Sequence, residues 1–357
     1  MASGLSQLEF PWAAPPAPGA VTEVAKGLFW ARMPLPFRLN HVNIWLLEED
    51  DGWTVIDTGC ATDQLFDVWE TLLSGAMGGL PIRRVVSTHG HVDHIGLSGW
   101  LVERFDAAFY STIAEWNWAR ISHLHDVPGA DAAHYRHLIR HGIDDDGARA
   151  IVTNRGRFID MATPIPNAIV EIRDGDTIRF GKRDWQVIVT GGHAFEHASF
   201  FDAESGILIA GDHILPKISP VVAVYETTPH GDPLADYLSS FPRFDMVPAD
   251  SLILPSHGML YRGIHERISQ LREHHRTRLE TTKGFLHDAK SAFELSRDMF
   301  PHVEGPEGAG FALAETIAHV NHLIRQGIVD EVTRPNGQLA FRLRQDRPAG
   351  KPQGDMR

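Results

Sequence analysis

The pattern of apolar and polar positions predicts strands and helices in alternation through the first part of the chain. Mixed alternating and apolar runs predict three strands, at residues 27–33, 42–47 and 53–57. Apolar residues then recur at helical spacing over residues 62–73, which predicts a helix. An apolar run predicts a buried strand at residues 82–88, and a second helix is predicted at residues 95–105. This order is typical of sheets that are covered by helices.

A helix-rich block that contains many Trp and His residues interrupts this rhythm. We interpret the block, at about residues 113–167, as an insertion. Six further strands are predicted after it, at residues 169–173, 177–180, 185–190, 199–202, 207–210 and 252–255. Together with the first strands and helices they predict one α+β domain over residues 27–263.

The character of the chain changes after this main domain. Three helices are predicted, at residues 264–286, 291–299 and 312–325. Strand-like runs follow at residues 328–334 and 338–344, and Asn336-Gly337 between them is a strong hairpin signal. Helices followed by a hairpin predict a small winged-helix-like domain. The predicted division is an N-terminal arm, the main domain, the winged-helix-like domain and a polar tail, at residues 1–26, 27–263, 264–345 and 346–357.

Composition and charge narrow the classes of function. The chain has 357 residues and carries 33 Lys and Arg against 46 Asp and Glu, a formal net charge of −13. Nucleic acid is held through clustered Lys and Arg, so an acidic chain makes a nucleic-acid partner unexpected. No apolar run approaches the roughly 18 residues that span a membrane. Residues 1–24 lack the basic start and apolar core of a secretory signal.

Cys60 is the only cysteine of the chain. An internal disulfide is therefore excluded, and so is a zinc site built from thiolates. Together with the absence of a secretory signal, this indicates a reducing, cytoplasmic setting. A small-molecule substrate is the expected partner, and a homo-oligomer is left open.

The segment Thr88-His89-Gly90-His91-Val92-Asp93-His94 carries the strongest chemical signal. It follows a predicted apolar strand and precedes a predicted helix. Four ligand-type side chains so close together would each need hydrogen-bond partners in a core. On a loop at a strand end they can instead converge on one point, and imidazole with carboxylate suits zinc, iron and related metals.

Three later segments repeat this arrangement. His193, Asp212 and His257 each follow a predicted apolar strand, and each lies next to a glycine, which permits a tight backbone turn. Ligand-type residues at the ends of several strands predict one shared metal centre.

These motifs resemble those of the metallo-β-lactamase superfamily of hydrolases. The resemblance rests on T-H-x-H-x-D-H at residues 88–94, G-H at 192–193, G-D at 211–212 and the last His at 257. Asp57-Thr58-Gly59 is similar to an early D-T-G turn of that family. The resemblance covers roughly residues 27–263 and implies a four-layer αββα sandwich, of the α+β class, with the site at one edge of the two sheets.

The resemblance also implies roles for individual residues. One metal ion would be held by His89, His91 and His193, and a second by Asp93, His94 and His257, with Asp212 bridging the two. Two divalent ions are thus implied, zinc by default, with iron or manganese as alternatives. Metals about 3.5–4 Å apart can share a hydroxide and polarise the substrate oxygen. Asp93 and Asp212 are therefore the expected catalytic carboxylates.

Other residues near these motifs receive supporting roles. Asp57 is expected to hold its turn beside the site, and His197 to hydrogen-bond a ligand from outside the metal centre. For His213, a place beside the site and an exposed position are equally open. The apolar segment 214–228 is expected to form a pocket wall, in which Tyr225 either hydrogen-bonds the substrate or only packs.

The insertion contains further histidines with metal-like spacing, His123, His125, His134, His137 and His141. They lack the strand-end pattern, so we do not expect a second metal centre there. Four aromatic residues are expected to pack, with the lining of a substrate pocket as the alternative, namely Trp116, Trp118, Tyr135 and Phe158.

The expected reaction is attack of a metal-bound hydroxide on the carbonyl of a small ester, thioester or lactone, with the metals stabilising the oxyanion. Three alternatives remain: a nuclease of the same fold, a mononuclear iron sulfur dioxygenase, and a non-catalytic binding protein. The acidic charge argues against the nuclease, and the complete ligand set argues against the binding protein.

Overall fold

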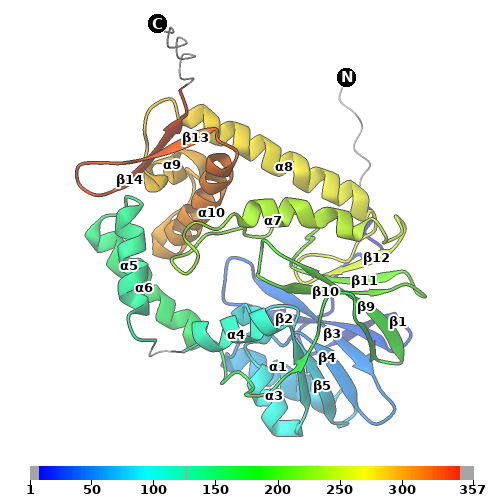
Figure 1. Cartoon of the computed structure of the whole chain (residues 1–357). Coiled ribbons are helices and arrows are strands. Elements are labelled where there is room, and N and C mark those ends of the chain that lie inside the picture. Colours follow the sequence, from blue (N-terminus) through cyan, green and yellow to red (C-terminus); the bar gives the residue numbers. More distant parts are fainter. Residues whose placement is uncertain (1–7, 125–126, 346–357) are drawn as a thin grey trace, which may run out of the picture.

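The computed structural model of the chain describes residues 8–124 and 127–345, with the backbone but not the side chains of residues 155–157. The predicted polar tail at residues 346–357 and the first seven residues of the predicted arm lie outside the described residues. In Figure 1 the two large sheets occupy the lower part of the view, and the C-terminal helices and hairpin, coloured yellow to red, occupy the upper part.

The first sheet has seven strands in the order of the sequence. They are β1 Val21–Ala25, β2 Leu28–Pro34, β3 His41–Glu48, β4 Trp53–Ile56, β5 Ile82–Val86, β6 Ala108–Ser111 and β7 Val170–Glu171. Neighbours from β1 to β4 pair antiparallel, and those from β4 to β7 pair parallel. Residues 21–25, which the sequence placed in the N-terminal arm, form the edge strand β1. Its short, half-polar sequence hides the alternation that marks longer strands.

The second sheet has five strands in the order β12-β11-β10-β9-β8. They are β8 Thr177–Phe180, β9 Arg183–Thr190, β10 His197–Asp202, β11 Ile207–Gly211 and β12 Leu252–Pro255. β8 to β11 pair antiparallel, and β12 pairs parallel to β11. As a result β9, β11 and β12 run in the same direction, and their carboxyl ends meet at one edge.

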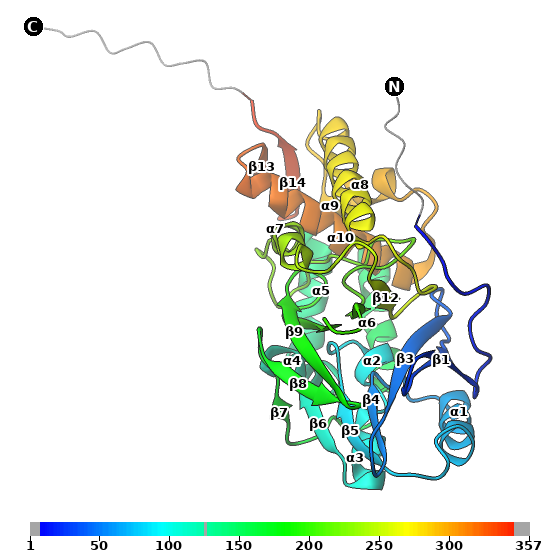
Figure 2. The ribbon, with the colours of Figure 1, turned by 90° about the vertical axis from the view of Figure 1, so that its right-hand side faces the viewer.

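Helices cover the outer face of each sheet. α1 Asp63–Ser74, α2 Val92–Ile95 and α3 Ser98–Phe105 lie against the first sheet, and α7 Pro233–Ser240, η1 Phe241–Phe244 and α8 Ile264–Phe285 against the second. Between the sheets the core includes the buried rings of Trp30, Trp45, Trp185 and Phe200. In Figure 2, α1 lies on one side of the first sheet and β8 and β9 on the other. The predicted α+β, four-layer αββα sandwich is confirmed.

The remaining elements form the insertion and the C-terminal part. They are α4 Ile113–Ser122, α5 Ala130–Arg140, α6 Asp145–Ile159, α9 Ala292–Met299, α10 Gly305–Arg325, β13 Val329–Thr333 and β14 Leu339–Leu343. The insertion contacts the C-terminal part, where Phe293 N donates to His141 O at 3.0 Å. The helices and hairpin expected there are present, and the winged-helix assignment stays a prediction. Across the described ranges, no helix has the length and apolar character needed to cross a membrane.

Candidate metal centre

The ligand-type residues predicted from the sequence lie at the carboxyl ends of strands. His89 and His91 follow β5, and α2 carries Asp93 and His94. The other three follow strands of the second sheet, with His193 after β9, Asp212 after β11 and His257 after β12. Since these strand ends share one edge of the sandwich, residues far apart in the sequence meet there.

Three of these residues form one cluster, which we call the three-histidine group: His89, His91 and His193. Their ligand-type nitrogens all lie within 4.8 Å of one another. His89 Nε2 lies 2.9 Å from His91 Nδ1 and 3.3 Å from His193 Nε2. The three imidazoles therefore face one common point.

A neighbouring cluster, which we call the Asp–His–His group, contains Asp93, His94 and His257. The Asp93 carboxylate lies between the two rings, 3.6 Å from His94 Nε2 and 3.5 Å from His257 Nε2. This group thus combines one carboxylate with two imidazoles, whereas the first group holds imidazoles alone.

Asp212 contacts both groups. Its Oδ2 lies 3.5 Å from His193 Nε2 and 3.6 Å from His94 Nε2. Its Oδ1 lies 3.2 Å from His257 Nε2. One carboxylate that reaches both groups has the placement needed to bridge two cations.

Buried atoms without hydrogen bonds support a cation at this place. Among the described residues, His94 Nε2, His257 Nε2 and Asp212 Oδ1 are buried and make no hydrogen bond. Burying an unpaired acceptor costs about 1–3 kcal/mol. All three atoms point into the clusters, so a bound cation would satisfy them together. The donor set, imidazole with carboxylate, fits zinc, iron or manganese.

In three of the histidine rings, the nitrogen that faces away from the clusters, Nδ1, is within hydrogen-bond distance of an oxygen of the protein. His94 Nδ1 lies 2.8 Å from Asp57 Oδ2, His193 Nδ1 lies 2.8 Å from Val221 O, and His257 Nδ1 lies 2.6 Å from His41 O. A hydrogen bond at Nδ1 fixes the tautomer and presents Nε2 as the ligand atom. The rings are therefore oriented before any cation binds.

The surroundings shift the pKa of the residues of the centre in different directions. Burial lowers the pKa of His89 well below its ordinary value, and the neighbouring imidazoles lower it further. Burial also opposes a charge on His94, but the surrounding carboxylates outweigh burial and raise its pKa. Burial acts to raise the pKa of Asp212, yet His257 and His94 outweigh it and hold that pKa well below the usual range. His89, neutral because of its lowered pKa, and the ionised Asp212 are in the states that bind a cation directly, whereas a cation at His94 would have to displace a proton from its ring.

The supporting residues differ in what they contact. Asp57, which adopts a left-handed φ of 62°, accepts from Thr88 N at 2.8 Å and contacts His94. His197 Nε2 accepts from Asp212 N at 3.0 Å and so holds the backbone of Asp212. His213 is fully buried, and its ring contacts Thr190 and Ser240. It therefore lies under the helix layer, and the exposed alternative for His213 is wrong.

The histidines of the insertion do not join the groups that could hold a metal in the described residues. His134 Nδ1 lies 3.6 Å from Glu226 Oε2, and the His137 ring packs on His141. His123 Nε2 lies 3.4 Å from Gly90 O. His125 lies outside the described residues.

The aromatic residues of the insertion and Tyr225 occupy different surroundings. Trp116 Nε1 donates to Pro166 O at 2.8 Å, and Phe158 stacks on Phe37 at 5.6 Å between ring centroids. Trp118 packs on the ring of His91 at 5.4 Å. Tyr225 is 36% exposed in the loop that follows β11. Trp118 is thus the aromatic residue in direct contact with the three-histidine group.

Sequence reasoning missed Glu115, a residue of α4. Its side chain is only 1% exposed, and its carboxylate accepts from Gly90 N at 2.8 Å and from Glu196 N at 2.9 Å. Burial raises the pKa of Glu115, and the backbone N–H donors oppose that rise. One signal was available, because Glu115 and Ala119 occupy the same buried face of the helix. A lone Glu on that face requires polar partners.

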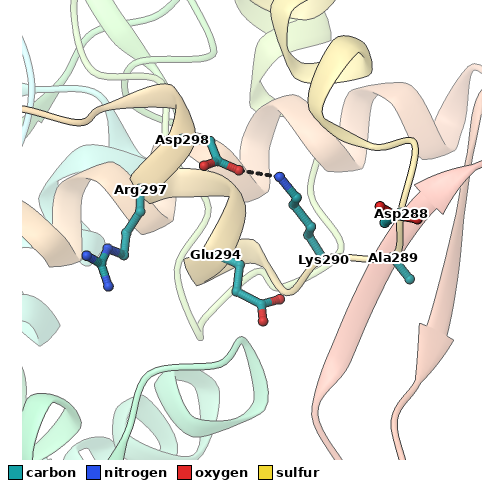
Figure 3. A pocket seen from close by; sticks show the side chains of 6 residues that line it. All are labelled: Asp288, Ala289, Lys290, Glu294, Arg297 and Asp298. Atoms are coloured by element: carbon teal, nitrogen blue, oxygen red, sulfur yellow. Dashed lines mark hydrogen bonds and ion pairs between the residues drawn. The ribbon is translucent and has the colours of Figure 1, made fainter.

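An open concavity lies away from these groups, in the C-terminal part. Figure 3 shows its lining residues, Asp288, Ala289, Lys290, Glu294, Arg297 and Asp298. The Lys290 ammonium pairs with Asp298, and Glu294 pairs with Arg334. Its charges are largely compensated within the protein, and none of its residues belongs to the groups described above.

The structure consists of two mixed sheets packed face to face, with helices on the outer faces and a cluster of His and Asp side chains at one edge. These features define the class of αββα proteins in which metal-ligand side chains meet where the strands end. Residues 38–257 match the family model described as Metallo-beta-lactamase superfamily. Residues 279–344 match the one described as Metallo-beta-lactamase-like, C-terminal domain. The chain belongs to the metallo-beta-lactamase superfamily.

Solved structures and a curated relative agree with this assignment. A beta-lactamase domain protein from Burkholderia ambifaria is 35% identical, with a TM-score of 0.87 over 94% of this chain and 98% of that one. A metallo-beta-lactamase family protein from Thermus thermophilus is 28% identical, with a TM-score of 0.78 over 90% of this chain and 100% of that one. The "Probable metallo-hydrolase YqjP" of Bacillus subtilis (strain 168) is 26% identical over 82% of this chain and 90% of its own length.

Proposed function

We propose that this protein is a dinuclear metal-dependent hydrolase of small esters, thioesters or lactones. The observation that carries the proposal is the placement of Asp212 between the three-histidine group and the Asp–His–His group, with buried ligand atoms that make no hydrogen bond. The similarity to a relative named a probable metallo-hydrolase supports the same class of reaction.

A pair of divalent ions would supply an acidified water and polarise the carbonyl oxygen of the substrate. The three-histidine group would hold one ion, the Asp–His–His group the other, and Asp212 would bridge them. Zinc is the default, and iron or manganese also suits these ligands. Side chains of the protein would orient the attacking water. Asp93, whose carboxylate lies 3.6 Å from His94 Nε2 and 3.5 Å from His257 Nε2, would accept a hydrogen bond from the attacking water and so orient it.

The surroundings support a partly apolar acyl group. Most apolar side chains of the 214–228 segment pack into the core, but Ile218 is 46% exposed and Tyr225 is 36% exposed. Phe195, in the loop that carries His193, is 51% exposed. Each methylene buried against such a surface gains roughly 0.8 kcal/mol. The net charge of −13 disfavours a polyanionic polymer. The single cysteine, buried Cys60, supports a reducing, cytoplasmic setting.

The first test is metal content combined with a substrate panel. We expect close to two metal ions per chain, and hydrolysis of esters, thioesters or lactones that becomes more efficient as the acyl chain lengthens over a few carbons. One tightly held iron per chain would favour a sulfur dioxygenase. Rapid cleavage of a labelled RNA oligomer, abolished by His89→Ala and without acyl hydrolysis, would favour a nuclease. Metal binding without turnover of any member of the panel would favour a binding protein.

The second test addresses the bridging carboxylate. Asp212→Ala should lose metal and activity together, because Asp212 contacts both groups. Asp67→Asn, on the exposed face of α1, is the control and should keep both. Full activity and two ions in Asp212→Ala would show that the bridge is assigned wrongly.

A further inference from the structure

Glu115 lies in the insertion and outside both ligand groups, but its contacts lead to one of them. Gly90, whose N–H donates to Glu115 Oε2 at 2.8 Å, stands between His89 and His91. Glu196, whose N–H donates to Glu115 Oε1 at 2.9 Å, belongs to the loop that carries His193. One buried carboxylate therefore joins the two loops that supply the three-histidine group.

Hydrogen bonds in the opposite direction, from the residues before Glu115 to Glu196, strengthen this contact. The Glu196 carboxylate accepts from Ala114 N at 3.0 Å, and Glu196 O accepts from Thr112 Oγ1 at 2.9 Å. Gly90 leaves space for this contact, because a Cβ at that position would lie 2.9 Å from Glu115 O. The start of α4 is thus fastened to the loop of His193 by reciprocal hydrogen bonds, and to the loop of Gly90 through Glu115.

The two ligand groups differ in how they are supported. The Asp–His–His group includes its own carboxylate, and Asp57 holds the outward nitrogen of His94 at 2.8 Å. The three-histidine group contains neutral ligands only, and shares Asp212 with its neighbour. Glu115 is the carboxylate that fastens the backbones of the two loops that carry the three-histidine group.

We propose, on the basis of the metal centre proposed above, that Glu115 is a positioning residue that sets the metal affinity of the three-histidine group and leaves the Asp–His–His group largely unaffected. A carboxylate accepts from two N–H donors at once. An amide of the same shape offers one oxygen and turns its NH₂ toward the other donor. Glu115→Gln therefore loosens one of the two loops while it preserves the volume of the side chain.

The experiment is a titration of the metal-free full chain with Zn²⁺ in competition with a chromophoric chelator, and with Co²⁺ followed by its visible absorption. The wild type should take up two ions. In Glu115→Gln we expect one ion to bind 10- to 100-fold more weakly, the range for removal of a group that orients ligands. The other ion should bind within about threefold of wild type, and excess metal should restore uptake.

The matched control is Asp202→Asn. Asp202 is also a buried carboxylate, 3% exposed, that accepts from backbone N–H groups, those of Glu204 and Ser205. It lies at the end of β10 opposite His197. Its substitution should lower the melting temperature of the metal-free protein without changing either affinity. If Glu115→Gln does not fold, as judged by circular dichroism, Glu115→Asp serves, since its shorter side chain cannot reach both donors.

The outcomes distinguish this inference from the proposed function. Two ions bound with wild-type affinity by Glu115→Gln and Glu115→Asp would overturn the role of Glu115 and leave the metal centre intact. Equal weakening of both ions, or a loss of stability like that of Asp202→Asn with unchanged affinities, would make Glu115 merely structural. A wild-type chain that binds no metal would overturn the proposed function itself.

Discussion

Arg267 of α8 is a buried cation whose removal should loosen the loop beside the metal centre. Its side chain is embedded in the protein and donates from Nε to Leu215 O at 2.6 Å and from an Nη to Ile218 O at 2.8 Å. A third bond reaches Gln270 Oε1 at 3.1 Å. These acceptors are neutral oxygens, so the guanidinium is held by carbonyl and amide groups. The loop that it clamps leads to Val221, whose carbonyl oxygen lies 2.8 Å from His193 Nδ1.

The substitution Arg267→Met removes the charged head and keeps most of the apolar stem. A hydrogen bond to a charged donor contributes about 1.5–3 kcal/mol. Loss of the two bonds to the loop should therefore lower the free energy of unfolding by about 3 kcal/mol, the lower end of that range for two bonds. We also expect weaker metal uptake, because the partner of His193 lies on the loosened loop.

The assay is urea unfolding of the metal-free protein at neutral pH, followed by a metal titration of each folded variant. Arg276→Met is the control, because its side chain is 64% exposed and pairs with Glu273 on the surface. That control should change stability by about 0.5 kcal/mol or less. A loss below about 1 kcal/mol in Arg267→Met would refute the reasoning, because the clamp would then contribute no more than an exposed contact.

Three further predictions follow from the same structure. Removal of residues 264–357 should give a poorly soluble protein, since α8 packs Ile264 and Leu271 on the second sheet; a soluble truncated chain with normal turnover would contradict this. Burial lowers the pKa of His275 to about 3 and of His319 to about 4. In the folded protein both rings stay neutral down to these values, whereas in the unfolded chain they take up protons below about pH 6.5. The free energy of unfolding should therefore fall as the pH drops from about 6.5 toward about 4, by up to about 1.4 kcal/mol per pH unit for each histidine. Urea unfolding of metal-free protein at several pH values checks this, and His275→Gln should flatten the slope. Tyr225→Phe should reduce turnover across an acyl-chain series if the hydroxyl contacts substrate, and unchanged kinetics would leave it a packing residue.

The sandwich and the ligand clusters were predictable because their signals are local. His89 to His94 stand beside an apolar strand within one short segment, and His193, Asp212 and His257 repeat that placement. Strand β1 was not recognised, because a five-residue, half-polar edge strand has little periodicity. Helix α7 was also missed, although Asp232 caps it and Pro233 follows, a typical start.

The supports of the centre could not be predicted in the same way. Glu115 accepts from backbone groups 25 and 81 residues away, and Arg267 donates to carbonyls 52 and 49 residues away. When a side chain bonds to a distant backbone group, the residue that supplies this group can be of almost any type, because every residue has a backbone carbonyl and nearly every residue a backbone N–H. Periodicity can place Glu115 on the buried face of its helix, but it does not identify the distant backbone groups that the side chain binds.

The spread of the ligands along the chain has a consequence for biosynthesis. His89 emerges long before His257, and at roughly 5–20 residues per second the ribosome needs on the order of ten to thirty seconds to make the chain between them. The strands of the second sheet are made only from residue 177 onward, and until they are in place the inner face of the first sheet, which includes Trp30, Trp45 and Val86, is not covered. The His257 ring is oriented by His41 O, which is synthesised 216 residues earlier and has no contact with this ring until His257 is made. Loading of the proposed metal centre would thus be completed late, and before the second sheet forms the nascent chain exposes an apolar sheet face of the kind that chaperones bind.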